Sequence, residues 1–184
     1  QALSALLFLY REVLGLNLPW MENVVRARHS RKLPVVLSKN QTMAVLAQMS
    51  GRNRLACTLL YGAGLRLLEC LRLRVKDVSF ERNEITVRDG KGGKDRRTVL
   101  PLSLKPDLQR QLEDVRVLHG RDRAEGFGAV SMPVALARKY PGAAFDLGWQ
   151  YLFPATRRGI DPFDAREKRH HLAETALQRA VRHA

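Results

Sequence analysis

Apolar residues recur at helical spacing along most of the chain, which predicts a series of amphipathic helices. The first covers residues 2–15. Ser38 followed by Gln41 is typical of a capping box, so a second helix is expected directly behind Ser38. Further helices are predicted over about 52–61 and from Arg66 to about Leu73.

The central segment changes to the alternation of a half-buried strand. We expect a short strand around Val75–Phe80, a second around 85–88 and a third over 98–100 that ends at Pro101. Helical spacing returns afterwards, and the remaining predictions are a helix after Pro106, a loop over 119–130, a short basic helix from Pro133 to Tyr140, and a last helix over about 172–183. The pattern predicts an α+β fold that is mostly helical, with a small antiparallel sheet.

Charge changes this picture more than the rest of the composition does. The 184 residues carry a formal net charge of +14, and 45% of them are hydrophobic. This length and apolar content support a real core, and the positive charge favours a polyanionic partner, above all nucleic acid. The basic residues are interleaved with aliphatic ones, which argues against a helix lying on a membrane.

Targeting and metal signals are missing from the sequence. The chain begins without a basic n-region, so we expect no signal peptide, and no apolar run reaches the roughly 20 residues of a membrane span. Cys57 and Cys70 have no metal-ligand spacing and are expected to be small core residues in a reducing compartment. We therefore predict no metal, no cofactor and no membrane association.

The strongest candidate for chemistry is the segment from Tyr61 to Leu71. Arg66 lies in an otherwise apolar run, where a guanidinium needs an anionic partner. Glu69 follows three residues later and could hold one edge of the guanidinium, which leaves the other edge for a phosphate. An ordinary ion pair between the two side chains is the alternative.

A second candidate is the turn between the last two predicted strands. Residues 89–97 combine three glycines with Lys91, Lys94, Arg96 and Arg97. The glycines suit a tight tip and the cations suit phosphate, although the turn lacks the spacing of a Walker A loop. We expect this tip to contact DNA, and the alternative is a solubilising hairpin.

The segment 17–37 is predicted to be a basic linker, because Pro19 and Pro34 break helices and arginines are frequent between them. It could follow a phosphate backbone or act as a solvated tether.

Gly64-Leu65-Arg66 with Glu69, the small sheet and the Lys-rich turn together resemble the catalytic domain of tyrosine recombinases, the phage-integrase class. The closer likeness is to integron integrases, and it covers essentially the whole chain. It rests on Ala2–Arg11, on Ala135–Pro141, on Gly148–Pro154 and on Arg169-His170-His171-Leu172.

This resemblance implies a protein that closes around DNA with two modules. Residues 1–16 would be the last helix of an N-terminal core-binding domain. Residues 38–184 would be part of the catalytic domain, with an integron-type insertion at about 119–171. The implied activity is integration and excision of gene cassettes by transesterification without metal or nucleotide, through a phosphotyrosyl intermediate. A tetrameric assembly on DNA in the bacterial cytoplasm is expected of the intact enzyme.

The resemblance also assigns roles to single residues. Arg66 matches the first catalytic arginine, which stabilises the charge on the phosphate undergoing transfer. Lys91 matches the lysine that protonates the leaving 5′-oxygen, with Lys94 as a possible substitute. Glu69 would orient Arg66.

The chain departs from the family pattern at its C-terminal end. Neither His170 nor His171 is followed by arginine three residues later, so the His-x-x-Arg box is not filled. None of Tyr10, Tyr61, Tyr140 and Tyr151 lies where the nucleophile belongs. We therefore interpret the chain as a fragment truncated at both ends, which binds DNA but lacks the nucleophile.

Integron integrases recombine a folded single-stranded site, a hairpin with bases outside its stem. Trp149, His170 and His171 are the candidates for gripping such bases, and Arg169 for contacting phosphate. The alternatives are a core aromatic at Trp149 and a surface turn at the histidine pair.

Three other functions make different demands on the sequence. A non-catalytic basic DNA-binding module shares the charge but does not need Arg66 and Lys91 to converge. A ribosome-associated RNA-binding protein would lack the Gly-Leu-Arg-x-x-Glu box. A metal-dependent nuclease needs clustered carboxylates, whereas Asp146, Asp161 and Asp164 are scattered.

Overall fold

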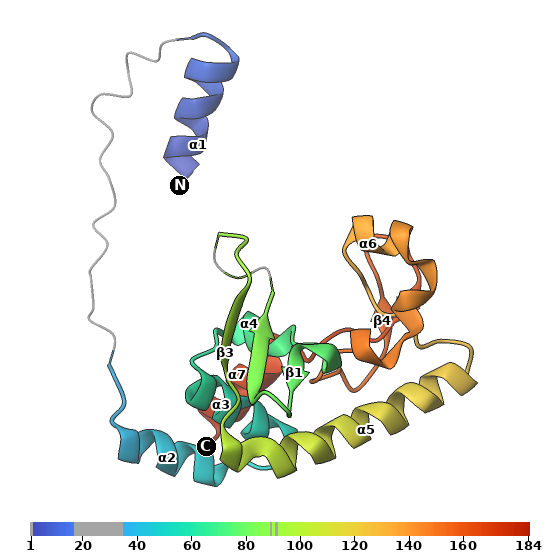
Figure 1. The fold of residues 1–184 in the computed structure, drawn as a ribbon. Coiled ribbons are helices and arrows are strands. Elements are labelled where there is room, and N and C mark those ends of the chain that lie inside the picture. Colours follow the sequence, from blue (N-terminus) through green and yellow to red (C-terminus); the bar gives the residue numbers. More distant parts are fainter. Residues whose placement is uncertain (1, 17–34, 89, 91) are drawn as a thin grey trace. The chain divides into compact units, whose positions relative to one another are not determined.

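The computed structural model describes residues 2–16, 35–88, 90 and 92–184 (Figure 1). Its residues fall into two compact units, Gln1–Val36 and Leu37–Ala184. In the first unit, α1 (Ala2–Phe8) continues as a π-helical segment over Leu9–Val13, where the sequence predicts one helix. Most of the predicted linker, residues 17–34, lies outside the described residues.

The second unit contains the remaining helices. They are α2 (Lys39–Gln48), α3 (Gly51–Ala63), α4 (Leu67–Leu71), α5 (Lys105–Ala124), α6 (Val134–Lys139) and α7 (Glu174–Arg182). Short 3-10 turns cover Val75–Asp77, Leu102–Leu104, Pro141–Phe145 and Leu147–Trp149. No helix among the described residues is long and apolar enough to cross a bilayer.

Helix ends follow local capping chemistry. The capping box predicted before α2 is confirmed, because the Gln41 N–H donates to Ser38 Oγ at 3.3 Å and the Ser38 N–H donates to Gln41 Oε1 at 2.8 Å. Gly64 ends α3 in the left-handed conformation, with φ of +62°. The chain then turns sharply, and α4 begins at Leu67 rather than at Arg66, which is extended and caps the helix.

The sheet is a three-stranded antiparallel meander, as the alternation predicts. Its strands β1 (Val78–Ser79), β2 (Glu84–Val87) and β3 (Arg96–Val99) pair in the order β1-β2-β3. Ile85 and Val87 of β2 are buried, so one face of the sheet lies on the core. Strands β4 (Gly159–Ile160) and β5 (Glu167–Lys168) form a second hairpin, too short to be recognised from periodicity.

The predicted loop over 119–130 is partly wrong. Helix α5 continues through Gly120 to Ala124. Asp122 lies on its inner side, only 3% exposed, and binds Arg158 and Arg169 from a distant part of the chain. These ion pairs stabilise the last, polar turn of α5. The sequence of the turn itself does not reveal them, because both arginines are distant in sequence.

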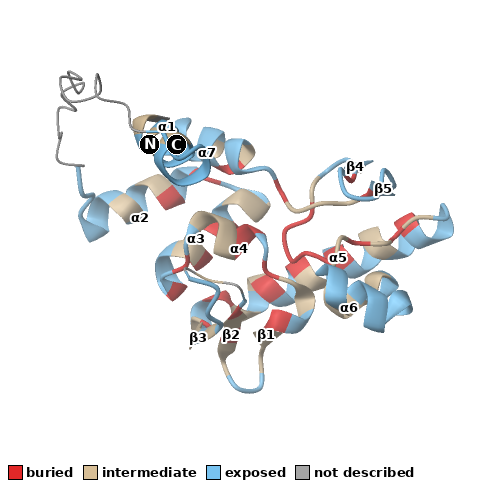
Figure 2. Ribbon diagram, turned by 90° about the horizontal axis from the view of Figure 1, so that it is seen from above, coloured by how far each residue is buried: buried red, intermediate tan, exposed pale blue. Residues whose placement is uncertain are grey.

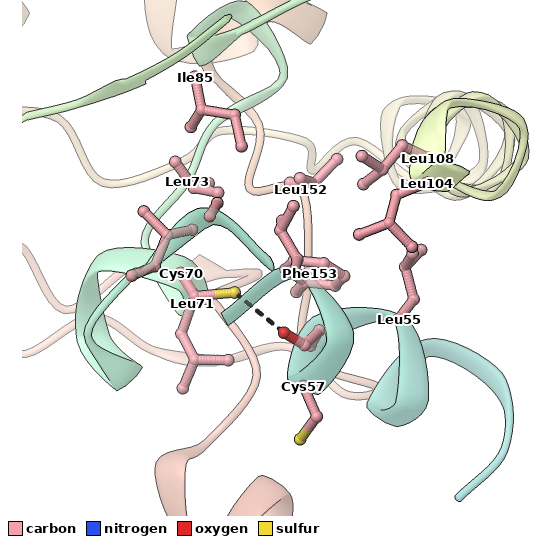
Figure 3. Packing of buried hydrophobic residues seen from close by; sticks show 14 of the residues in the cluster. Leu55, Cys57, Cys70, Leu71, Leu73, Ile85, Leu104, Leu108, Leu152 and Phe153 are labelled. Carbon is pink, nitrogen blue, oxygen red and sulfur yellow. Dashed lines mark hydrogen bonds between the residues drawn. The ribbon is translucent and has the colours of Figure 1, made fainter. Parts of the chain in front are cut away.

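The core lies where α3, α4, β2, α5 and α7 meet. Leu71, Ile85, Leu108 and Phe153 are fully buried there (Figure 3), as is Leu59. Figure 2 shows the buried positions gathered on the inner sides of these elements. Cys57 and Cys70 are buried free thiols, as predicted from the sequence.

The segment 149–154 attaches the chain between α5 and α7 to this core. The Leu152 N–H donates to the Leu73 carbonyl at 2.8 Å, and the Leu172 N–H donates to the Phe153 carbonyl at 2.7 Å. Gln111 of α5, itself buried, donates to the Leu152 carbonyl at 2.9 Å. Leu152 and Phe153 of this segment belong to the core, while its backbone joins elements far apart in sequence.

Asp122 provides a test of this fold. Burial raises the pKa of its carboxyl, but hydrogen bonds from Arg169 and Arg158 outweigh burial and leave the pKa below its usual range. Asp122→Asn leaves the buried Arg169 without its counter-charge and removes one of the three carboxylates that pair with Arg158. We expect it to lower the free energy of unfolding by about 3 kcal/mol, measured by urea denaturation at pH 7. The exposed Asp114→Asn is the control, with little change.

The contacts of Asp122 with the two arginines also make the free energy of unfolding depend on pH. A carboxyl whose folded pKa is depressed contributes stability above its unfolded pKa, near 4, and this contribution is lost as the pH falls through the folded pKa. The difference between the parent and Asp122→Asn should therefore shrink as the pH falls below about 4. A difference that stayed constant down to pH 2 would contradict the ion-pair account.

Candidate functional site

The carboxylate of Glu69 is the centre of the site. Its side chain is only 8% exposed, and both oxygens accept hydrogen bonds. Oε1 accepts from Arg66 Nη1 at 2.7 Å, and Oε2 accepts from the Arg66 backbone N–H at 2.8 Å and from Arg96 Nη2 at 2.7 Å. One buried carboxylate thus holds two guanidinium groups that come from separate elements.

Arg66 lies at the start of α4, where its extended backbone points its N–H toward Glu69. The two residues pair as predicted, but Arg66 precedes the helix, and the Glu69 side chain reaches back to accept from its backbone N–H and from its guanidinium. The Arg66 side chain remains 60% exposed. One edge of the fork is therefore held by Glu69, and the exposed remainder can bind an anion such as a phosphate.

Local charge keeps Glu69 ionised. Burial raises the pKa of this carboxyl, but the hydrogen bonds from Arg66 and the positive charge of Arg96 lower it further than burial raises it. The pKa of Glu69 therefore lies below its usual range, and the carboxylate stays charged at neutral pH.

The β2–β3 hairpin reaches the same carboxylate. Besides the Arg96 contact, Thr98 Oγ1 donates to the Ala63 carbonyl at 2.8 Å, which fixes β3 against the end of α3. At the other end of the hairpin, the Gly90 N–H donates to the Lys94 carbonyl at 3.2 Å. A Cβ atom on Gly90 would lie 2.9 Å from that carbonyl oxygen and 3.6 Å from Glu69 Oε1. Glycine is needed here because a side chain would collide with the Lys94 carbonyl oxygen across the turn, while the distance to Glu69 is an ordinary contact that places the turn beside this carboxylate.

The structure describes only one of the two candidate lysines of this hairpin. Lys91, the predicted proton donor, lies outside the described residues. Lys94 is described and exposed at the tip. Its predicted contact with DNA stays a prediction.

Arg96 and Arg97 are adjacent, but they lie on opposite faces of β3 because strand side chains alternate. Arg97 is 71% exposed, and the distance from its Nη1 to Glu84 Oε2 is 3.9 Å, which is long for an ion pair. Its guanidinium can therefore reach a phosphate. Arg96 is bound to Glu69 and lies 3.4 Å from the Gly64 carbonyl. The sequence placed both among the DNA contacts, and the geometry gives Arg96 a partner inside the protein instead.

A hollow of about 430 Å³ opens beside Glu69. Its lining includes Leu68, Glu69, Arg72, Arg88, Trp149 and Tyr151. Trp149 is half-buried at this wall, neither fully in the core nor free in solution. Lys76 Nζ lies 2.7 Å from the centre of its ring. The hollow thus combines cations with aromatic surface next to the Arg66 site.

Basic residues that sequence reasoning did not single out shape this hollow. Asp77, 4% exposed, accepts from the Arg74 N–H at 3.0 Å and from Arg88 Nε at 2.7 Å. Arg74 also donates to the carbonyls of Trp149 and Ser131, which fixes the wall of the hollow. The sequence feature that could have indicated Arg74 and Lys76 is the alternation of aliphatic and basic residues over 71–76.

Lys76 occupies an unusual position for a lysine. Partial burial lowers the pKa of its ammonium, and the positive charge of Arg88 lowers it further. The ring of Trp149 compensates in part, because its face attracts cations. An anionic ligand entering the hollow would relieve the same repulsion between Lys76 and Arg88.

The other predicted base and phosphate contacts lie elsewhere. Arg169 is only 12% exposed, and it donates to both oxygens of Asp122 and to the carbonyls of Ala155 and Thr156. These partners occupy its Nε, Nη1 and Nη2 atoms, so the predicted phosphate contact does not fit the structure. Arg169 holds the segment that follows β5 against α5.

The histidine pair is half-buried. His171 Nδ1 lies 2.8 Å from the Leu172 carbonyl, and its ring packs edge-on against Tyr151 with 5.4 Å between centroids. The His170 carbonyl accepts from the Ala155 N–H at 2.7 Å. In the part of the chain that the structure describes, no group of three histidine, cysteine or acidic side chains could hold a metal ion.

Comparison with known proteins gives a consistent result. The model of the phage integrase family matches residues 36–184. Proteins named integrase/recombinase from Escherichia coli and Pseudomonas aeruginosa are each 45% identical over 184 residues, covering 100% of this chain and 55% of their own length. The tyrosine recombinase XerA of Pyrococcus furiosus is 38% identical over 119 residues, which is 61% of this chain and 38% of that protein.

A solved structure shows the same fold. The crystal structure of XerA recombinase superposes with a TM-score of 0.51 and 23% identity, over 96% of this chain and 50% of that one. The expected fold class is thereby confirmed. The chain spans about half the length of the curated relatives that it matches over all its residues.

Glu69→Gln tests the electrostatics of the site. Glutamine can still accept the Arg66 backbone N–H, but it loses the charge that holds both guanidiniums. We expect the free energy of unfolding at pH 7 to fall by about 2 kcal/mol. Because the folded pKa of Glu69 is depressed, the difference from the parent should shrink below about pH 4, where the carboxyl is protonated in both states.

Urea denaturation at pH 7 and pH 3 measures this difference. The control is Glu113→Gln, which removes an exposed pair with Arg116 on α5 and should change little at either pH. Equal effects of the two substitutions at pH 7 would contradict the role given to Glu69.

Proposed function

Because the chain belongs to the phage integrase family, we propose that it forms part of an integron-type tyrosine recombinase, which integrates and excises gene cassettes. One observation carries the chemical part of this proposal. Arg66 presents an exposed guanidinium that a buried carboxylate holds in one orientation, directly beside a lysine-rich hairpin. A protein that only needs positive charge for DNA has no need of such an orientation.

The reaction proposed for the intact enzyme is a transesterification. A tyrosine of the intact enzyme, which is none of the tyrosines of this chain, gives its hydroxyl proton to water or to a base and attacks a DNA phosphate. Its oxygen forms a bond to phosphorus, and the bond from phosphorus to the 5′-oxygen of the next nucleotide breaks. Arg66 stabilises the negative charge that the phosphate oxygens carry during transfer. Lys91 or Lys94 gives a proton to the leaving oxygen. The step requires no metal or nucleotide.

The positions of these groups along the chain fit the roles proposed for them. Arg66 follows α3, and Lys94 lies on the hairpin tip whose base packs against Glu69. The phosphate would therefore bind on the exposed side of Arg66, on the same side of Glu69 as this hairpin. In the assembly proposed for the intact enzyme, four subunits hold two DNA sites together in the bacterial cytoplasm.

The integron-level part of the proposal concerns the hollow beside Glu69. A base outside the stem of a folded single strand needs an aromatic face and nearby cations, which Trp149, Lys76 and Arg88 offer. Lys76 covers one face of the Trp149 ring. A stacking base would displace this long side chain, whose ammonium could then contact the adjacent phosphate. His170 and His171 would contribute at the margin of the same segment.

Binding to folded DNA tests this proposal. We expect the chain to bind a single-stranded DNA hairpin with bulged bases about tenfold more tightly than a plain duplex at the same salt concentration, because each stacked base adds about 1–3 kcal/mol. Trp149→Ala should remove the preference. The control is Tyr61→Ala, an aromatic residue of α3 that is 51% exposed, which should keep it.

Fluorescence anisotropy at two salt concentrations measures both affinities and the salt slope. Equal and steeply salt-dependent binding to the two DNAs would remove the integron-type assignment. A non-catalytic basic DNA-binding module would then describe the chain.

The assignment of the nucleophile gives a separate prediction. Tyr151 is only 8% exposed. None of the chain's tyrosines stands at the sequence position at which the family pattern has its nucleophile. We expect no covalent protein–DNA adduct when the 184-residue chain is incubated with a nicked hairpin substrate and analysed on a denaturing gel. A shifted band that persists in denaturant and disappears after protease treatment would overturn it.

A further inference from the structure

Arg96 is the basic residue of the hairpin that the proposed chemistry leaves without a role. Its guanidinium donates to Glu69 Oε2 at 2.7 Å and lies 3.4 Å from the Gly64 carbonyl oxygen. The side chain is 37% exposed, about half the exposed fraction of the neighbouring Arg97. Arg96 therefore directs its strongest interaction into the protein rather than toward a ligand.

Glu69, the partner of Arg96, is also the partner of Arg66. Glu69 uses one oxygen for Arg66 Nη1 and shares the other between Arg96 and the Arg66 backbone N–H. The hairpin and the start of α4 are thus joined through a single carboxylate, although their residues are 27 positions apart in sequence. A movement of β3 away from α4 would break this contact first.

Charge gives a second reason for the arrangement. Glu69 alone would cancel the charge of Arg66 and weaken its attraction for a phosphate. With Arg96 present, two guanidiniums and one carboxylate leave a net charge of +1 at the site, and the carboxylate can orient Arg66 without neutralising the surface around it.

We propose that Arg96 is a positioning residue, which acts through Glu69 to hold the β2–β3 hairpin beside Arg66 and to keep the phosphate site positively charged. This inference rests on the proposed function, since it assumes that Arg66 binds a DNA phosphate. It differs from the sequence-based expectation, in which Arg96 itself contacts DNA. The two ideas predict different outcomes for the same substitutions.

The matched control is Arg97, the next residue on the same strand, which lies on the opposite face and is 71% exposed. Arg97→Gln removes one exposed charge, so it should weaken binding to a bulged DNA hairpin modestly and reduce the salt slope by about one unit. Arg96→Gln removes the same charge and also the link to Glu69. We expect its affinity to fall by about a further fivefold.

The decisive comparison repeats both substitutions in a Glu69→Gln background. There the charged link is already broken, so Arg96→Gln should cost no more than Arg97→Gln. If Arg96 only contributes a charge facing DNA, its cost will be the same in both backgrounds and equal to that of Arg97, and the proposal fails. A fall in affinity caused by general unfolding would persist in the Glu69→Gln background, which also counts against the proposal.

A measurement without DNA tests the link directly. The carboxyl carbon of Glu69, followed by NMR during a pH titration, reports its pKa. Arg96→Gln should raise this pKa because Arg96 lowers it in the parent, and Arg97→Gln should leave it unchanged. An unchanged pKa in Arg96→Gln would overturn the proposal.

Arg96→Lys separates the two parts of the role. A lysine keeps the charge and can reach Oε2, but it lacks the planar fork that also approaches the Gly64 carbonyl. Its affinity should lie between those of the parent and Arg96→Gln, and it provides the comparison if Arg96→Gln does not fold. Failure of the parent chain to bind DNA would remove the proposed function and this inference together. Binding by the parent with equal losses in Arg96→Gln and Arg97→Gln would remove this inference alone.

Discussion

The site depends on one buried carboxylate that is shared by two arginines. A buried charge is costly unless opposite charges and hydrogen bonds surround it, and Glu69 satisfies this requirement with Arg66, Arg96 and a backbone N–H. The requirement acts in both directions. Glu69 stays ionised because the arginines are present, and the arginines adopt fixed positions because Glu69 is. The turn after α3, the start of α4 and strand β3 therefore meet at one point.

A second set of buried arginine contacts holds the segment between α5 and α7 on the rest of the second unit. Asp122 on α5 binds Arg158 and Arg169, while Arg74 donates to the backbone carbonyls of Trp149 and Ser131. These cations support the structure and have little capacity left for a ligand. The excess of positive charge that suits DNA is carried instead by exposed residues such as Lys94 and Arg97.

The chemistry and the architecture of this protein are closely connected. The exposed side of Arg66, the hairpin tip and the hollow lined by Trp149 adjoin Glu69 or the residues packed on it. A recombinase that recognises an unpaired base could use this proximity, since the base and the phosphate undergoing transfer would bind to adjoining surfaces. The curated relatives are about twice as long as this chain, so the remaining groups of the proposed reaction are properties of the whole enzyme.

Local patterns in the sequence determined the helices, the meander and the pair of Arg66 with Glu69, because periodicity, capping and contacts three residues apart are encoded within a few positions. Only the tertiary structure distinguished Arg96 from Arg97, turned Arg169 toward Asp122, extended α5 to Ala124 and left Trp149 half-buried at the wall of a hollow. Each of these outcomes depends on a partner distant in sequence, 27 positions away for Arg96 and 47 for Arg169. A basic residue looks the same in sequence whether its carboxylate lies in the protein or its phosphate lies on DNA, and the fold decides which of the two it meets.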